Sequence, residues 1–118
     1  MRSILTVCRT GTRPYPRFVG LVPEHLRPTV RKELDALVRG ERPDALEWVH
    51  AYGDHGATLV RQPDDVWDHP HADAVQTAAG GWHVVVPLWT TSESPSDLSA
   101  EVVVAADGSA TLHNVHVL

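Results

Sequence analysis

Three β-prone segments separated by turn residues fill the last third of the chain, and they constrain the fold more than any other feature. They span residues 82–89, 98–105 and 110–118 and are rich in valine and leucine. Apolar runs of this length, bounded by polar and turn-forming residues, are typical of β-strands. The Asp107-Gly108 pair between the last two segments predicts a hairpin. Together the three segments predict an antiparallel meander.

Residues 28–39 predict an amphipathic helix. Apolar side chains recur there at helical spacing and form one stripe: Leu26, Val30, Leu34, Leu37 and Val38. Pro28 suits the first turn of a helix, because proline lacks the N–H that an interior position requires. Gly40 is a natural residue for the C-terminal cap. The helix is therefore expected to begin near Pro28 and to end before Gly40.

A second helix is expected at residues 43–52. Pro43 suits its first position, Gly53 ends it, and apolar residues recur at helical spacing between them.

The signals between this helix and the first strand are weaker. Residues 57–61 are too few to assign, because a short apolar run fits a strand or a helix equally well. A single helical turn through Val66 and Trp67 is expected, capped by Asp64 or Asp65. Residues 68–81 have the composition of a loop.

The order of the elements, helices first and strands last, predicts an α+β fold. The expected architecture has two N-terminal helices packed on one face of a three- to four-stranded antiparallel meander sheet. Residues 1–22 are expected to form a flexible arm, with a short strand at residues 4–7, and residues 23–118 a single α+β domain.

The alternation of side chains predicts which face of the sheet is buried, because a one-residue slip exchanges the two faces. The core face is expected to carry Trp82, Val84, Val86, Leu88, Leu98, Ala100, Val102, Val104, His113, Val115 and Val117. The other face is expected to carry His83, Val85, Pro87, Trp89, Ser99, Glu101, Val103, Leu112, Asn114 and His116. This mixed face is either solvated or an interaction surface. Pro87 cannot donate to a ladder, which predicts that its strand is an edge strand or bulges there.

Charge is distributed unevenly along the chain. The formal net charge is −5; residues 1–42 hold nine basic and four acidic residues, and residues 43–118 hold one basic and eleven acidic residues. This acidic body argues against nucleic-acid binding, which needs a basic face. It is compatible with a basic protein partner, or it serves solubility alone.

The cysteine content and the apolar runs bear on the compartment. Cys8 is the single cysteine, so the chain forms no internal disulfide and no cysteine-built zinc site. A free thiol favours a reducing compartment. No signal peptide or apolar run of membrane-spanning length is recognised. We therefore expect a cytoplasmic protein with no membrane partner.

The C-terminal half resembles a family of small bacterial domains of unknown function. Their shared pattern reads Trp-x-Val-x-Val-Pro-Leu-Trp-Thr, an acidic spacer, Ser-Asp-Leu and a final His-Val-Leu. Here the matching residues are Trp82, Val84, Val86, Pro87, Leu88, Trp89, Thr90, Ser96, Asp97, Leu98, His116, Val117 and Leu118. The spacer departs from the family's usual Glu-Glu-Gly, and residues 1–20 lie outside the match. The resemblance implies an accessory or immunity-type protein, and the family has no activity that can be carried over to this chain.

The loop after the first strand is the leading candidate for a binding site. It is polar, joins two strands and follows a tryptophan, and loops on rigid strands often carry function. The candidate residues are Trp89, Thr90, Thr91, Ser96 and Asp97, together with Glu101 and His116 on the outer face. The alternative is a structural turn, in which Ser96 or Asp97 bonds to nearby backbone and Trp89 packs under the loop.

A second candidate is a metal site in the segment 68–73. His69 and His71 share a face if the segment is extended, and Asp68 or Asp73 would complete a zinc or nickel shell. The alternative is a solvated loop, because the segment matches no established metal motif.

No catalytic motif was found. The chain lacks a Gly-x-Ser-x-Gly elbow and both common phosphate-binding glycine patterns. The leading hypothesis is a non-enzymatic protein-binding module without a cofactor. The alternatives are a metal-binding protein or metal-dependent enzyme using His69 and His71, and a homodimeric scaffold joined near Pro87 or through the outer face.

Overall fold

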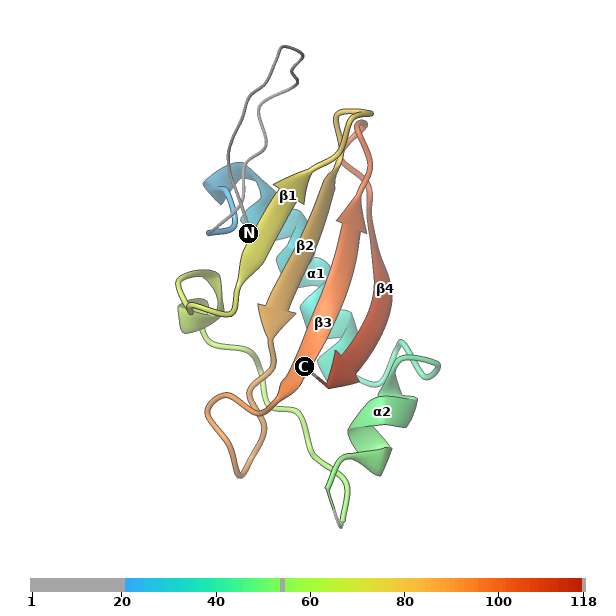
Figure 1. Ribbon diagram of the computed structural model, residues 1–118. Coiled ribbons are helices and arrows are strands. Elements are labelled where there is room, and N and C mark those ends of the chain that lie inside the picture. Colours follow the sequence, from blue (N-terminus) through green and yellow to red (C-terminus); the bar gives the residue numbers. More distant parts are fainter. Residues whose placement is uncertain (1–20, 54, 118) are drawn as a thin grey trace.

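A computed structural model describes residues 21–53 and 55–117. It has a four-stranded antiparallel sheet with one long helix behind it (Figure 1). The strands lie side by side in chain order, so the predicted antiparallel meander and α+β class are confirmed. The strands are β1 (Asp73–Gln76), β2 (Trp82–Pro87), β3 (Leu98–Val104) and β4 (Ala110–Val117). The expected strand at residues 4–7 and most of the expected arm lie outside the described residues, although Val22 is buried in the core.

The long helix α1 (Arg27–Val38) agrees closely with the predicted one. A 3-10 turn, η1 (Glu24–Leu26), leads into it, and Pro28 lies in its first turn. Val30, Leu34 and Leu37 are fully buried against the sheet. Gly40 follows the helix with a φ of 82°, a left-handed conformation that glycine adopts without strain. The apolar stripe therefore points inward, as its spacing predicted.

The expectation that two helices pack on the sheet is wrong. The second helix, α2 (Leu46–Ala51), has only six residues and lies beside the end of β4, not across the sheet (Figure 1). Residues 43–45 form a turn in place of the first helical turn. Within α2 only Val49 is buried, and Trp48 is 51% exposed. A helix this short brings too few apolar side chains to one side to cover a sheet face.

The expectation of a loop at residues 68–81 is also wrong, because this segment contains β1. Ala74 pairs with Val84 and is fully buried, so β1 extends the core by one strand. Its four residues follow a stretch rich in His, Asp and Pro, which hides the strand pattern. The expected turn at Val66 is present as η2 (Asp64–Trp67), but no side chain caps it.

Pro87 is not on an edge strand, because β2 lies between β1 and β3. The next residue, Leu88, donates its N–H to Leu98, so the nitrogen of Pro87 faces the β1 side. No residue of β1 lies opposite Pro87, because the pairing of β1 with β2 extends only as far as the pair Asp73–Val85. The missing N–H of proline therefore costs no ladder hydrogen bond.

The face assignment holds for β2 and β3 and fails in part of β4. Val84, Val86, Leu98, Ala100, Val102 and Val104 are buried as expected, and Trp82 is half-buried. In β4 a bulge intervenes, because Glu101 pairs with Asn114 while Val102 pairs with Leu112. His113 is the extra residue and is exposed instead of lying in the core. Leu112 takes the inward position and packs against the core.

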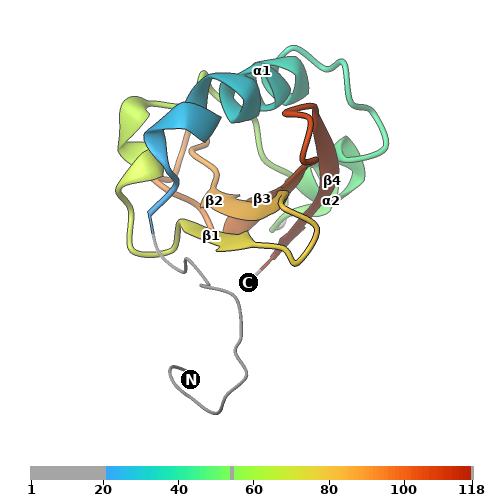
Figure 2. The ribbon, with the colours of Figure 1, turned by 90° about the horizontal axis from the view of Figure 1, so that it is seen from above.

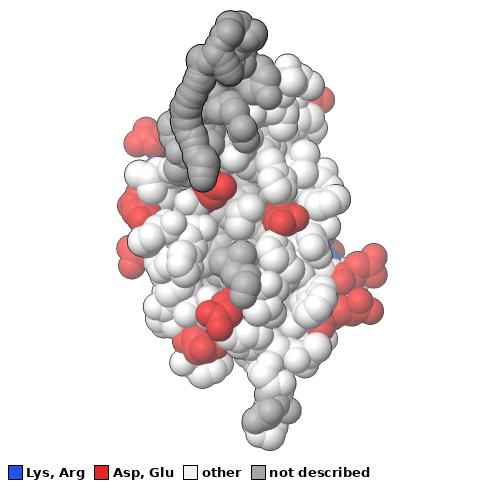
Figure 3. All heavy atoms as spheres, viewed as in Figure 1, with Lys and Arg blue, Asp and Glu red and all other residues white. Residues whose placement is uncertain are grey.

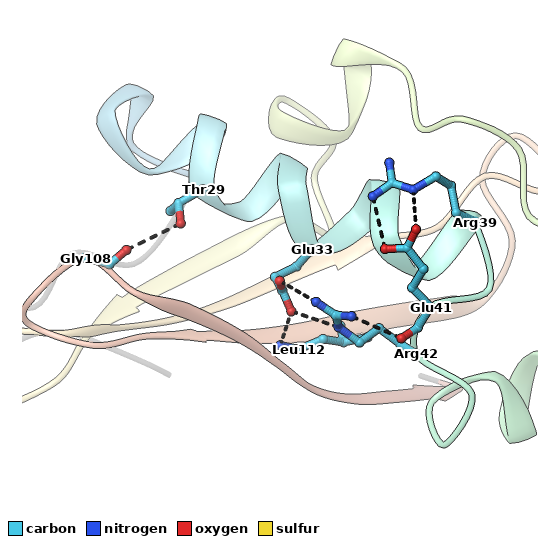
Figure 4. Close-up of polar contacts among 7 residues, drawn as sticks. All are labelled: Thr29, Glu33, Arg39, Glu41, Arg42, Gly108 and Leu112. Carbon is cyan, nitrogen blue, oxygen red and sulfur yellow. Dashed lines mark hydrogen bonds and ion pairs between the residues drawn. The ribbon is translucent and has the colours of Figure 1, made fainter.

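Glu33 ties this bulge to α1 (Figure 4). Its carboxylate accepts hydrogen bonds from the N–H of Leu112, at 2.9 Å, and from the Arg42 guanidinium, at 3.0 Å. Burial on its own raises the pKa of the Glu33 carboxyl. The hydrogen bonds from Arg42 and Leu112 and the positive charge of Arg42 outweigh it, so the pKa lies below its ordinary value. Glu33 therefore stabilises the fold as a carboxylate.

We predict that Glu33→Gln lowers the free energy of unfolding by about 1–2 kcal/mol at pH 7, because a neutral amide replaces a charged acceptor. The contribution of a carboxyl with a lowered folded pKa is present above its unfolded pKa and is lost as the pH falls through the folded one. The difference between the variant and wild type should therefore shrink on acidification from pH 7 to about pH 3. Urea denaturation at several pH values measures it.

The matched control is Glu41→Gln. Glu41 pairs with Arg39 on the surface, where water and salt screen the ion pair and it contributes little to stability. An equal loss of stability in both variants, or a Glu33→Gln effect that grows on acidification, would contradict this role of Glu33.

Candidate functional site

The loop between β2 and β3 is held in place by two of its predicted site residues. Ser96 is buried; its hydroxyl donates to the carbonyl of Leu88 at 2.8 Å and accepts the N–H of Leu98 at 3.1 Å. Thr90 is also buried, and its hydroxyl accepts the N–H of Glu93 at 3.1 Å. These contacts fit the structural-turn alternative for Ser96 and Thr90. Thr91 and Asp97 are exposed.

Tyr52, at the end of α2, anchors the same loop. Its hydroxyl donates to Glu93 Oε1 at 2.8 Å and accepts the N–H of Asp97 at 3.2 Å. The N–H of Asp97 on its own lowers the pKa of the Tyr52 phenol. The hydrogen bond to Glu93 and the nearby carboxylate charges oppose it, and the pKa is raised overall. The loop is thus fixed at both ends and presents Thr91 and Asp97 on a rigid frame.

Gln62 is a buried polar residue that no sequence pattern marks. It is fully buried, and its side-chain amide contacts the backbone of Trp89 twice. Trp89 N–H donates to Gln62 Oε1 at 2.7 Å, and Gln62 Nε2 donates to the Trp89 carbonyl at 2.9 Å. The amide thus takes the place of a neighbouring strand just beyond the end of β2.

Trp89 itself is half-buried, where exposure was expected. Its ring packs against the core and meets the edge of the His69 ring, with centroids 5.7 Å apart. Trp48 on α2 is the tryptophan that the structure exposes. Trp89 is therefore less available to a partner than its position in the alternating pattern suggested.

His69 and His71 lie together, with ring centroids 4.9 Å apart. The N–H of His71 donates to His69 Nδ1 at 3.1 Å, which occupies one of the four ring nitrogens. Within residues 21–53 and 55–117, no three His, Cys, Asp or Glu side chains form a group suited to a metal ion. The expected third ligand, Asp73, is therefore not brought to the pair.

The outer face of the sheet is the side away from α1. Figure 2 shows α1 on one side of the sheet and no described helix on the other. The strand register places these side chains on it: Asp73, Val75, His83, Val85, Ser99, Glu101, Val103, Thr111, Asn114 and His116. None of the strand residues is Lys or Arg. Figure 3 views this side: where described residues are visible, acidic side chains lie on the face and Lys or Arg appears only near its rims.

Glu101 lies at the centre of this face, between two histidines from the neighbouring strands. His83 Nε2 is 3.8 Å from Glu101 Oε1, and His116 Nδ1 is 3.6 Å from Glu101 Oε2. His116 Nδ1 and the hydroxyl of Ser99 are buried without a hydrogen-bond partner. Two predicted site residues, Glu101 and His116, thus meet here; His83 was placed on the same face but not proposed for the site.

Ser99 cannot serve as the nucleophile of a Ser–His–Glu arrangement with His116 and Glu101. Its side chain is completely buried, so a substrate has no access to the hydroxyl. The cluster is suited instead to binding: one carboxylate, 22% exposed, is flanked by two imidazoles.

Two hollows lie elsewhere on the described surface. One, of about 420 Å³, lies between residues 41–45 and residues 112–114 of β4. The other, of about 240 Å³, lies between the end of α1, α2 and residues 57–59, and most of its lining is apolar. Neither contains a nucleophile paired with a base. No helix in the described part of the chain has the length and apolar character needed to cross a membrane.

Comparison with known proteins gives one match. Residues 19–118 match the domain of unknown function DUF7668. No curated protein and no solved structure matches the chain. The match agrees with the expected membership of a domain family whose function is unknown.

We predict that Gln62→Leu lowers the free energy of unfolding by about 2–3 kcal/mol, because the buried N–H of Trp89 loses its partner and the Trp89 C=O keeps only the longer bond from the N–H of Val60. Urea denaturation measures the loss, and faster hydrogen exchange at the Trp89 amide should accompany it. Gln76→Leu on β1 is the control, since the half-buried Gln76 side chain forms no hydrogen bond with the described residues. Equal stability of the two variants would contradict this role of Gln62.

Proposed function

The chain belongs to this family of unknown function, and from its own geometry we propose that it is a non-enzymatic module that binds a basic surface of another protein. The binding surface is the outer face of the sheet together with the exposed residues of the 90–97 loop. The observation that carries the proposal is a sheet face that no described helix covers and whose described strand residues include two carboxylates and no Lys or Arg.

The distribution of cations supports a basic partner. Five of the six basic residues after residue 20 lie between positions 27 and 42, in α1 and the turn after it. Four of these arginines pair with carboxylates away from the outer face: Arg27 with Asp68, Arg31 with Asp64, Arg39 with Glu41 and Arg42 with Glu33. Within residues 21–53 and 55–117, the outer-face carboxylates of Asp73 and Glu101 have no arginine partner of this kind. Complementary charge favours association with a basic surface and speeds it.

Apolar side chains lie beside these carboxylates. Val75, Val85 and Val103 are on the same face, and Val103 is 38% exposed. A contact surface that combines buried apolar groups with a few charges is typical of protein interfaces. The valines would supply contact area, while Glu101 and Asp73 would select the partner by charge.

The 90–97 loop supplies a rigid extension at the end of the sheet. The loop is held by Ser96, Thr90 and Tyr52, so the backbone at Thr91 and Asp97 has little conformational freedom before a partner binds. Preorganised loops lose less entropy on binding. An immunity-type protein that caps a basic toxin, which the family resemblance implied, would be one form of this function.

We predict that Glu101→Lys and Val103→Lys each weaken binding of the partner more than tenfold, because each places a cation where a basic surface must dock. The partner is isolated by affinity capture with the full chain, purified, and titrated by calorimetry. The control is Asp65→Lys, which changes the charge by as much as Glu101→Lys does, at an exposed position in η2. Melting curves confirm that each variant is folded.

Three results would contradict the proposal: a captured protein that is acidic, a purified partner that binds both outer-face variants as tightly as wild type, or equal losses in Asp65→Lys. A concentration-dependent dimer that Glu101→Lys abolishes would instead assign the face to a second copy of the chain. Sedimentation of the purified protein distinguishes that outcome.

A further inference from the structure

The cluster of His83, Glu101 and His116 has a local charge that depends on pH in the physiological range. The three side chains come from β2, β3 and β4 and meet on the outer face, with Glu101 in the middle. With both imidazoles neutral the cluster carries one negative charge, and with both protonated it carries one net positive charge. Histidine is the side chain whose charge ordinarily changes near neutral pH, so the sign of the cluster's charge depends on whether the two imidazoles are protonated.

We propose that Glu101 receives a cationic side chain of the partner, and that protonation of His83 and His116 releases it. This inference rests on the proposed function and adds the contact point and its regulation. The ligand group is a guanidinium or ammonium of a basic protein segment. The Glu101 side chain is 22% exposed, so part of it is accessible from outside the protein.

The reversal of charge is assigned to the two histidines and not to the other groups on this face. The remaining outward positions of the described strands carry Val, Ser, Thr, Asn and Pro, and Asp73 on β1 is the one other titratable side chain among them. Carboxyl groups ordinarily titrate well below the range in which histidines do. No described helix brings a further charge to the face.

His116 adds a second cause of release. Its Nδ1 is buried without a hydrogen-bond partner and lies 3.6 Å from Glu101 Oε2. A buried polar atom without a partner is costly, and a short shift of a protonated ring would give it a charged acceptor. Protonation therefore both adds positive charge and engages the carboxylate that the partner uses.

The experiment uses the full chain and, as the probe, an octa-arginine peptide whose N-terminus carries a rhodamine label that does not titrate between pH 5.5 and 7.5 and whose C-terminus is amidated. Arginine keeps its charge at both pH values, so only the protein titrates. Fluorescence anisotropy at matched ionic strength should show binding about tenfold weaker at pH 5.5 than at pH 7.5. Glu101→Gln should lose most of the binding at pH 7.5.

The double variant His83→Gln/His116→Gln tests the switch itself. Its binding should change less than about threefold over the same pH range. His113→Gln is the control: this exposed histidine lies at the β4 bulge, outside the cluster, so the variant should keep the full pH dependence. Ring-proton NMR of wild type should show the signals of His83 and His116 moving when the peptide is added.

The outcomes separate this inference from the proposed function. If the double histidine variant loses binding on acidification as wild type does, the switch is overturned while the basic-partner proposal stands. If Glu101→Gln binds octa-arginine as tightly as wild type, Glu101 is not the contact point. If Glu101→Lys and Val103→Lys also bind the peptide unchanged, the outer face is not the binding surface and both proposals fail.

Discussion

A four-stranded sheet has two faces, and in the described part of this chain one long helix lies on one of them. Val30, Leu34 and Leu37 of α1 bury one face, and α2 is too short and too far to the side to cover the other. A sheet face without such cover must carry side chains that tolerate water. The histidines, Glu101, Asn114 and Thr111 meet that requirement. The polar character of the outer face thus follows from how many helices the fold has.

The long helix and the last three strands were predictable because their signals are local. Each lies in a continuous apolar pattern with its own period, and the Asp107-Gly108 turn fixes the last hairpin. The β4 bulge was not predictable, because it depends on a hydrogen bond between Glu33 and Leu112, which are 79 residues apart. Without that contact a strict alternation places His113 inward. β1 and the short α2 were misjudged for the same reason: tertiary pairing outweighs their weak local pattern.

The candidate site was predictable in its residues and not in its arrangement. Alternation along the strands placed Glu101 and His116 outward, but their contact with each other and with His83 depends on the register of three strands. In the 90–97 loop, a polar residue suits a turn and a binding site equally well. Burial separates the two roles, since Ser96 and Thr90 lie inside while Thr91 and Asp97 lie outside. The role of Gln62 was not predictable, because a single glutamine before a proline does not differ from the sequence of an ordinary loop.

The contacts that stabilise the fold and the surface proposed for binding lie on different sides of the sheet. The Ser99–His116 pair belongs to the binding side and reduces stability. Most of the polar contacts that hold the fold lie on the helix side or in the loop: Glu33 with Leu112, Gln62 with Trp89, and Ser96 with Leu88. On the outer face, Ser99 and His116 instead bury polar atoms that have no partner. Such atoms cost stability, about 1–3 kcal/mol each, and native structures retain few of them. Local costs of this kind are typical of functional positions. The two residues that bury these atoms lie directly opposite each other, beside Glu101. Their position favours this part of the outer face as a functional site that is kept at a cost in stability.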